Sequence, residues 1–139
     1  MEFEISEFVE EDRAELRQLY NDVRKETFNR IESQKKYTFD LDTKGEAIMV
    51  AKTEGKVAGF ISVWLPDNFI HHLYIRKEYR RKGLGSSLIG HVKKQLKKPL
   101  TLKCLLDNIN AVKFYEKNGW NAKSTGISDH GVFILFELV

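Results

Sequence analysis

One short segment near the middle of the chain, EYRRKGLGSSL (residues 78–88), constrains the fold more than any other feature. It follows the apolar run NFIHHLYI (residues 68–75), which predicts a strand, and it leads into a run whose apolar spacing predicts a helix. The N-terminus of a helix exposes unpaired backbone N–H groups and carries about half a positive charge. Gly83 and Gly85 would let the backbone approach a ligand without a Cβ in between. The segment therefore predicts a strand-to-helix corner that binds an anion.

The distribution of charge supports an anionic ligand at this corner. Residues 76–98 hold nine Lys and Arg residues and one acid, Glu78, whereas the whole chain has a formal net charge of only +3. The last four lysines of this segment solvate the expected helix and complement its C-terminal dipole. Arg80, Arg81 and Lys82 precede the helix, where the dipole disfavours cations, so they need another explanation.

The rest of the chain predicts helices and strands arranged around that corner. The expected elements are a helix over 9–24, a weaker helical stretch over about 27–36, a hairpin of strands 46–53 and 57–64, the strand 68–75, a helix from Leu84 that ends before Pro99, a strand over 100–106, a helix over 110–118 and a closing strand over 131–138. A length of 139 residues fits one domain, spanning residues 1–139. We therefore expect a single α/β (α+β) domain with a mixed, mostly antiparallel sheet flanked by helices.

The composition favours a cytoplasmic protein without a membrane partner. No stretch approaches the roughly 18 uninterrupted apolar residues that a membrane span needs. The acidic start MEFEISEFVEED is also the opposite of a signal peptide. The single cysteine, Cys104, lies in the apolar run LTLKCLL, where we expect a small core residue rather than a nucleophile.

A second motif gives the corner a more specific interpretation. The spacing Arg80-x-x-Gly83-x-Gly85 lacks the Gly-Lys-Ser/Thr ending of a P-loop and has two of the three glycines of a dinucleotide fingerprint, so alone it is a weak signal. A helix and a strand later comes DNINAVKFYEKNGW (residues 107–120). Together the two motifs resemble the GNAT superfamily of acyl-CoA-dependent N-acetyltransferases. The second motif matches that family at Asn108, Ala111, Phe114, Tyr115, Gly119 and Trp120.

The resemblance implies a site for acetyl-CoA as co-substrate and no metal. It implies that a parallel strand pair splays apart to hold the cofactor, whose pyrophosphate lies on backbone amides of the corner. The residues implied for cofactor binding are Leu73, Tyr74 and Ile75 beside the pantetheine arm, then Arg80, Arg81, Lys82, Gly83, Leu84, Gly85 and Ser86 around the pyrophosphate, and Asn108.

The resemblance also implies catalytic residues. Tyr115 matches a tyrosine near the thioester sulfur and would protonate the leaving thiolate as general acid. An amine acceptor arrives mostly protonated, and His71 is the expected base, at a position where some members acting on small arylalkylamines carry a histidine. Alternation places His71 and His72 on opposite faces of their strand, unless the strand bulges. Other candidates for the base are water, Glu26, Glu32 and Asp129.

The sequence thus predicts an N-acetyltransferase that moves acetyl from acetyl-CoA to a primary amine by direct attack in a ternary complex. The alternative is a non-catalytic acyl-CoA-binding sensor or regulatory domain. Nucleic acid is disfavoured as a partner, because Tyr79 is the only aromatic residue among the cations of residues 76–98. The acceptor stays open, and Phe28, Tyr37 and Phe39 fit an acceptor pocket and the core equally well. A homodimer through the exposed edge of the last strand is also open.

Overall fold

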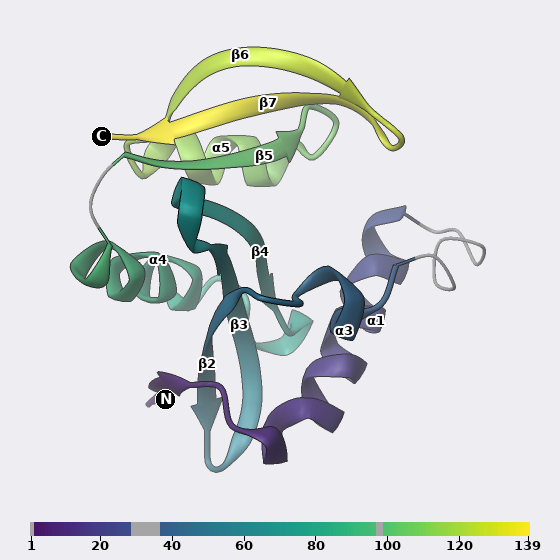
Figure 1. Cartoon of the computed structure of the whole chain (residues 1–139), viewed down its shortest axis with the longest axis vertical. Coiled ribbons are helices and arrows are strands. Elements are labelled where there is room, and N and C mark those ends of the chain that lie inside the picture. Colours follow the sequence, from purple (N-terminus) through teal and green to yellow (C-terminus); the bar gives the residue numbers. More distant parts are fainter. Residues whose placement is uncertain (1, 29–36, 97–98) are drawn as a thin grey trace.

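The computed structural model describes residues 2–28, 37–96 and 99–139 and places them around one seven-stranded sheet (Figure 1). The strands are β1 (Glu4–Glu7), β2 (Ala47–Thr53), β3 (Lys56–Trp64), β4 (Phe69–Ile75), β5 (Leu100–Leu105), β6 (Asn121–Ser128) and β7 (Gly131–Leu138). The helices are α1 (Arg13–Phe28), the short α3 (Phe39–Asp42), α4 (Leu84–Gln95) and α5 (Ile109–Lys117), with 3-10 turns η1 (Glu10–Asp12), η2 (Leu65–Asp67) and η3 (Lys77–Tyr79). The predicted α+β domain with a mixed sheet is confirmed.

The sheet consists of two antiparallel parts that meet at one short parallel pairing. Its order is β1-β2-β3-β4-β5-β7-β6, and only β4 and β5 run in parallel. That pairing is limited to Phe69 opposite Thr101 and Ile70 opposite Leu102. From His71 onward β4 diverges from β5, so the two strands form a V (Figure 1). The splayed parallel pair that the sequence predicted is therefore present.

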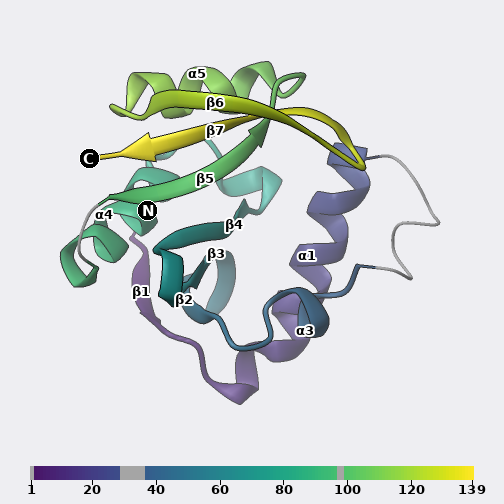
Figure 2. The ribbon, with the colours of Figure 1, turned by 45° about the horizontal axis from the view of Figure 1, so that its top comes forward.

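Helices bury the sheet on both faces. α4 and α5 cover one face, where Leu88 of α4 packs in a core that includes Ile61 of β3. α1 covers the other face, where Leu19 packs with Phe60. Figure 2 shows α1 and α4 on opposite sides of β2, β3 and β4. Each fully buried Leu, Ile or Phe contributes about 1.5–3 kcal/mol, so the two cores hold β4 firmly between them. Within the described ranges, none of the helices is both long and apolar enough to cross a membrane.

The N-terminal helix differs from its prediction at both ends. Its first turn is the 3-10 turn η1, in which the backbone N–H of Val9 donates to Asp12 Oδ2 at 3.2 Å. The α-helix begins at Arg13 and continues to Phe28, four residues beyond the expected end at residue 24. The weaker helical stretch expected over 27–36 lies almost wholly outside the described residues.

Two strands, β1 and β6, were not predicted. β6 reads NAKSTGIS and seven of its eight residues are exposed, so it lacks the apolar alternation that marks a strand. β6 pairs with β7 along its whole length, which places β7 between β5 and β6. The expectation that the last strand forms an exposed edge is therefore wrong. That edge belongs to β6.

Candidate active site

The corner between β4 and α4 presents the uncapped N-terminus of a helix. β4 ends at Ile75, η3 follows, and α4 begins at Leu84 with Gly83 as its N-cap residue. Gly83 has a φ of +80°, which glycine adopts without steric cost, and as a glycine it has no side chain with which to cap the helix. Arg81 also has a positive φ, of 64°, which strains a residue that carries a Cβ. The N–H groups of a first helical turn have no intrahelical partners, so this corner provides the donors that an anion site requires.

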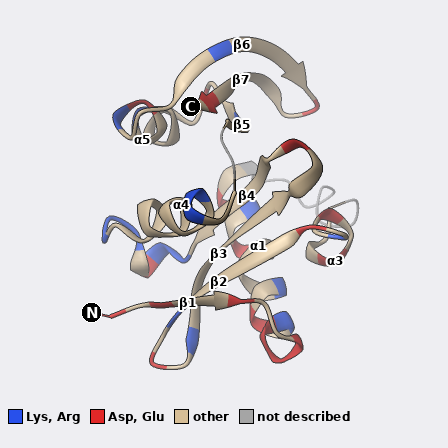
Figure 3. Ribbon diagram, turned by 60° about the vertical axis from the view of Figure 1, so that its left-hand side comes forward, with Lys and Arg blue, Asp and Glu red and all other residues tan. Residues whose placement is uncertain are grey.

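The cations of the corner differ in their contacts. Arg80 donates from Nε to the carbonyl oxygen of Ile75 at 2.9 Å and pairs through Nη1 with Glu26 Oε2 of α1 at 2.7 Å. Arg81 and Lys82 are exposed. Figure 3 shows Lys and Arg residues gathered on the loop before α4. Arg80 therefore links the corner to α1, while Arg81 and Lys82 surround the helix N-terminus from outside.

Only one of the two corner glycines has open surroundings. A Cβ at Gly83 would meet nothing within 4 Å. A Cβ at Gly85 would lie 3.3 Å from Cζ of Phe114 and 3.8 Å from Cδ2 of Leu73. Ser86, on the same turn, donates from Oγ to Asn118 Oδ1 at 3.3 Å. The absence of a side chain at Gly85 is thus explained by the packing of α5 against α4, which the sequence did not reveal.

β4 has a backbone edge without a strand partner beside this corner. Its residues 72–75 pair with β3, whereas the pairing with β5 ends at Ile70 in the part of the chain that the structure describes. Leu73 and Ile75 pack against the core under α4, and Tyr74 packs on the α1 side. An extended arm with amide groups can add to such an edge as a further strand.

Tyr115 lies on α5, beyond the other arm of the V. Its half-buried ring packs between Trp120 and Phe136, with ring centroids 5.8 and 5.7 Å away. Burial, and then the Cys104 thiol and the Tyr74 phenol nearby, raise the pKa of Tyr115 well above its usual value. The hydroxyl therefore stays protonated around neutral pH and can act as a proton donor.

Asn108 and Cys104 also have clear structural surroundings. Asn108 is the N-cap residue of α5, and its Oδ1 accepts a hydrogen bond from the Ala111 N–H at 3.3 Å. It thus has a capping role besides the cofactor contact that the resemblance implies. Cys104 is 6% exposed, and burial raises the pKa of its thiol to about 11. Its predicted role as a core residue is confirmed.

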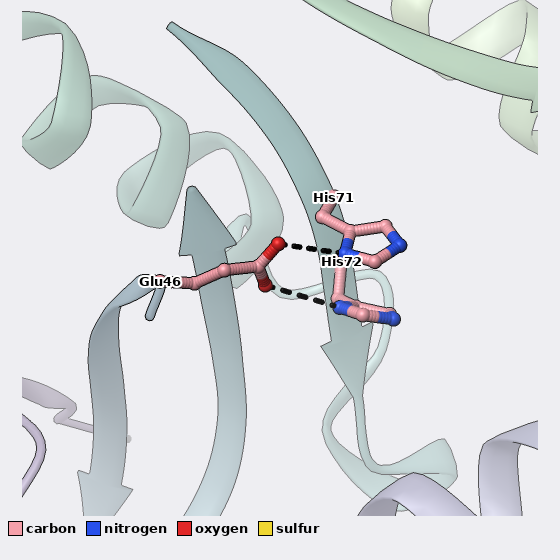
Figure 4. Close-up of side chains that lie close together, drawn as sticks. All are labelled: Glu46, His71 and His72. Carbon is pink, nitrogen blue, oxygen red and sulfur yellow. Dashed lines mark hydrogen bonds and ion pairs between the residues drawn. The ribbon is translucent and has the colours of Figure 1, made fainter. Parts of the chain in front are cut away.

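A carboxylate and two histidines meet where the V begins to open (Figure 4). Glu46, directly before β2, places Oε2 2.7 Å from Nδ1 of His71 and Oε1 3.9 Å from Nδ1 of His72. Nδ1 of His72 also lies 2.8 Å from Oγ of Ser62 on β3. Burial, followed by the charges of His71 and Arg24, lowers the pKa of His72 well below its usual value, so His72 is neutral at pH 7. One ligand atom from each of Glu46, His71 and His72 lies within 4.8 Å of the others.

A β-bulge brings the two histidine rings together. Ser62 lies opposite His72 and Val63 lies opposite Ile70, so His71 is an extra residue without a partner on β3. The ring centroids of His71 and His72 are 4.0 Å apart. β4 therefore bulges at His71. Because of this bulge, the two histidines do not lie on opposite faces of the strand, where regular alternation would place them.

The aromatic candidates for an acceptor pocket have separate locations. Phe39 is 2% exposed and belongs to the core under α1. The Tyr37 hydroxyl donates to Asp129 Oδ2 at 3.3 Å, and its ring lies 5.4 Å from that of His130, both in the turn between β6 and β7. The side chain of Phe28 lies outside the described residues. Of the two described side chains, Tyr37 is the one that lies between Arg24 of α1 and the β6–β7 turn.

The carboxylate beside His71 is one that the sequence analysis missed. Among the predicted alternatives, Glu26 pairs with Arg80, and Glu32 lies outside the described residues. Glu46 is 25 residues from His71 along the chain, and no local motif connects them. Only the pairing of β2, β3 and β4 brings the two side chains together.

Comparison with known proteins gives a consistent result. A model of the acetyltransferase (GNAT) family matches residues 13–120. The PaiA N-acetyltransferase of Thermoplasma acidophilum in complex with coenzyme A is similar, with a TM-score of 0.81, 24% identity, and coverage of 99% of this chain and 99% of that one. Apo-form YjaB of Escherichia coli has a TM-score of 0.79 at 20% identity, covering 100% of this chain and 99% of its own. Arabidopsis thaliana Naa50 in complex with the bisubstrate analogue CoA-Ac-MVNAL has a TM-score of 0.79 at 18% identity, with coverage of 100% and 99%.

The family match includes both arms of the V. Residues 13–120 contain α1, the strands β2 to β5, and the helices α4 and α5. The corner, the divergent edge of β4 and the helix that carries Tyr115 all lie inside this range. The chain therefore belongs to the acetyltransferase (GNAT) family, the acetyl-CoA-dependent N-acetyltransferases.

Proposed function

We propose that this acetyltransferase moves acetyl from acetyl-CoA to a primary amine by direct attack in a ternary complex. One observation carries the proposal: in the described part of the chain, residues 72–75 of β4 have no strand partner on the side of β5, and this edge leads through η3 to the uncapped N-terminus of α4. An arm with amide groups that is joined to a pyrophosphate needs these two features in this order. The coenzyme A in the PaiA structure and the bisubstrate analogue in the Naa50 structure support a cofactor and an amine acceptor in one site.

The cofactor would lie along β4 and the corner. In this proposal the pantetheine arm pairs with the backbone of residues 73–75. The pyrophosphate accepts hydrogen bonds from backbone amides of residues 80–86 and from the side-chain hydroxyl of Ser86. Arg81 and Lys82 screen the phosphate charge, since both are exposed around the helix N-terminus. Asn108 contacts the cofactor from α5 with its side-chain amide, while its Oδ1 caps the helix.

The chemistry would divide between the two arms of the V. His71 accepts a proton from the amine, directly or through water, and the neutral nitrogen attacks the thioester carbonyl. A main-chain N–H of β4 stabilises the oxyanion that forms. As the C–S bond breaks, Tyr115 gives its proton to the leaving thiolate, and the proton that the new amide nitrogen loses restores the Tyr115 hydroxyl. Two observations support these roles: His71 lies where β4 leaves β5, and burial keeps the Tyr115 hydroxyl protonated by raising its pKa.

The proposal is tested by a panel of amines with acetyl-CoA, read as release of free thiol. We expect release with at least one class of primary amine, and we expect Tyr115→Phe to lower turnover about 100-fold without weakening acetyl-CoA binding in calorimetry. Tyr79→Phe is the matched control, because the Tyr79 ring packs edge-on against Phe3. Binding of acetyl-CoA without thiol release from any amine would favour a non-catalytic acyl-CoA-binding domain. Full turnover in Tyr115→Phe would remove the acid role from this residue.

Location and assembly complete the proposal. We place the reaction in the cytoplasm, as the compartment that supplies acetyl-CoA. A homodimer would use the exposed edge of β6, because β7 is paired on both sides. Light scattering of the purified protein distinguishes a monomer from such a dimer.

A further inference from the structure

We propose that Glu46 is a positioning residue, which holds His71 in the tautomer and orientation that accept the proton of the amine. The inference rests on the proposed function, because it takes His71 as the base. To that function it adds the carboxylate of Glu46, directly before β2, which acts on the amine only through His71.

The contact between Glu46 and His71 decides which ring nitrogen accepts a proton. Oε2 of Glu46 lies 2.7 Å from Nδ1 of His71. An ionised carboxylate can only accept hydrogen bonds, so Nδ1 carries the hydrogen and Nε2 keeps its lone pair. In Figure 4 the second nitrogen of the His71 ring points away from Glu46. His71 therefore presents Nε2 as the proton acceptor on the side away from the carboxylate.

The two partners are buried to very different degrees. The Glu46 side chain is 6% exposed and the His71 side chain is 42% exposed. Oε1 of Glu46 is buried and has no hydrogen-bond partner within the described ranges. A buried carboxylate with an unfilled oxygen is destabilising, and a positive charge formed on His71 would offset that effect. The carboxylate is thus placed to stabilise the imidazolium that forms when His71 takes the proton.

The other ionisable groups around the pair do not replace Glu46. Of the recorded ionisable groups, His72 of β4 contacts His71 itself. The others are one step further away: Tyr20 of α1 and Tyr74 of β4 pack against His72, Arg24 of α1 acts on His72 electrostatically, Asp42 of α3 bonds to Tyr20, and Lys103 of β5 lies over the Phe69 ring beside His71. Asp42 accepts a hydrogen bond from the Tyr20 hydroxyl. His72 is neutral and contacts Ser62. Among the residues that the structure describes, Glu46 is the anion recorded within hydrogen-bond distance of His71.

The β-bulge of β4 creates this contact. Ile70, directly before His71, packs in the core under α4, and His72, directly after it, packs against Tyr20 of α1. In a regular strand His71 would point to the face opposite His72. As the extra residue of the bulge it instead places its ring beside that of His72 and within reach of Glu46.

The test combines the tautomer of His71, read by ¹⁵N NMR, with the value of kcat/KM. We expect the Nδ1–H form in the wild-type protein. Glu46→Ala should populate the Nε2–H form and lower kcat/KM by about 10- to 100-fold, with an unchanged KM for acetyl-CoA. Glu46→Gln keeps an oxygen that accepts from Nδ1 but removes the charge. Glu46→Gln should therefore keep the Nδ1–H form and retain more of kcat/KM than Glu46→Ala, a rescue by the conservative variant that a loss of packing would not give.

A matched control separates this role from a general effect of losing a buried acid. Glu137→Gln makes the same change in a carboxylate that pairs with Lys123 on the β6–β7 hairpin, and it should leave the tautomer of His71 and kcat/KM unchanged. Conversely, an unchanged tautomer and an unchanged kcat/KM in Glu46→Ala would overturn the proposal.

Two further outcomes are distinguished by the same set of variants. Full turnover in His71→Gln would show that the base of the proposed function is wrong, and the positioning role would fall with it. Slow turnover in His71→Gln with normal turnover in Glu46→Ala would overturn only the positioning role. Dialysis against EDTA followed by ZnCl₂ should not change turnover. A loss that zinc restores would overturn the proposal in favour of a metal held by the three side chains.

Discussion

The corner and the Glu46–His71–His72 cluster lie toward opposite ends of β4, yet the chain builds them in different ways. The corner is one continuous segment, and its shape depends on backbone dihedrals such as the φ of +80° at Gly83. The cluster takes side chains from the start of β2 and from β4, and Ser62 of β3 supports it. Its shape depends on a bulge in the pairing of β3 with β4. We therefore expect the corner to lose its function through a change in its own backbone. The cluster should lose its function through a change in strand register or in burial.

This difference predicts that either region can be damaged while the other stays intact. If acetyl-CoA binds as proposed, its affinity reports on the corner, whereas the tautomer of His71 reports on the cluster. Variants that separate the two readouts support the comparison, and variants that change both together contradict it.

Among the variants that test acetyl-CoA binding, the largest effect is expected from Gly83→Ala. An alanine at a φ near +80° costs about 1–2 kcal/mol, and its Cβ would narrow the space from which the pyrophosphate approaches the amides. We expect the Kd for acetyl-CoA, measured by calorimetry, to rise at least about tenfold, which corresponds to about 1.4 kcal/mol. The ¹⁵N signals of His71 should stay as in the wild-type protein.

Gly55→Ala is the matched control for this experiment. Gly55 lies in the turn between β2 and β3 with a φ of +79°, and a Cβ there would also meet nothing within 4 Å. It should lose a similar free energy of unfolding and keep normal affinity for acetyl-CoA. Equal losses of affinity in both variants would mean that destabilisation, and not the corner, explains the effect.

The same contrast explains how much of the site the sequence could predict. The glycine pattern before α4 and the motif on α5 are contiguous, so the corner and the position of Tyr115 followed from them. Glu46 could not be found in this way, because its contact with His71 depends on the order of β2, β3 and β4. The bulge was considered only as an exception, since no residue pattern around His71 specifies the register with β3.

An effect of intermediate size is expected on the free energy of unfolding, which should depend on pH because His72 is buried. Burial keeps His72 neutral in the native state by lowering its pKa well below the usual value, whereas in the unfolded chain it titrates near pH ~6.5. Below that pH the unfolded state binds more protons than the native state. The free energy of unfolding should therefore fall as the pH drops below about 6.5, by up to about 1.4 kcal/mol per pH unit, in urea denaturation.

Two variants sharpen this prediction. His72→Gln should lose the contribution of His72 to the pH dependence, because glutamine does not titrate. Gly83→Ala should keep the pH dependence of the wild-type protein, since the corner and the cluster are independent. An identical pH dependence in His72→Gln and the wild-type protein would show that His72 is not kept neutral by burial.

The elements of the fold differ in the same way: some follow from their own sequence, and others depend on pairing with a distant segment. α4 was predicted correctly because Leu84, Leu88 and Val92 mark one buried face in the sequence itself. β6 could not be predicted, because its polar residues are held in the sheet by pairing with β7 and not by a buried face of their own. The placement of β7 between β5 and β6 depends on that same pairing.

The smallest effect is expected at the ion pair that links α1 to the corner. The Glu26 and Arg80 side chains are each 38% exposed, so their pair contributes only about 0–1 kcal/mol to stability. Its effect on the cofactor should be easier to measure, because Glu26 neutralises Arg80 at 2.7 Å and competes with a phosphate for the guanidinium. In Glu26→Gln we expect the Kd for acetyl-CoA to fall about twofold to fivefold at low salt, and less at high salt, where the charges are screened. Glu46→Gln, the same substitution near the other end of β4, should leave this Kd unchanged. A higher Kd in Glu26→Gln would show instead that Glu26 orients Arg80 toward the phosphate, and the corner would then depend on α1 as well as on its own backbone.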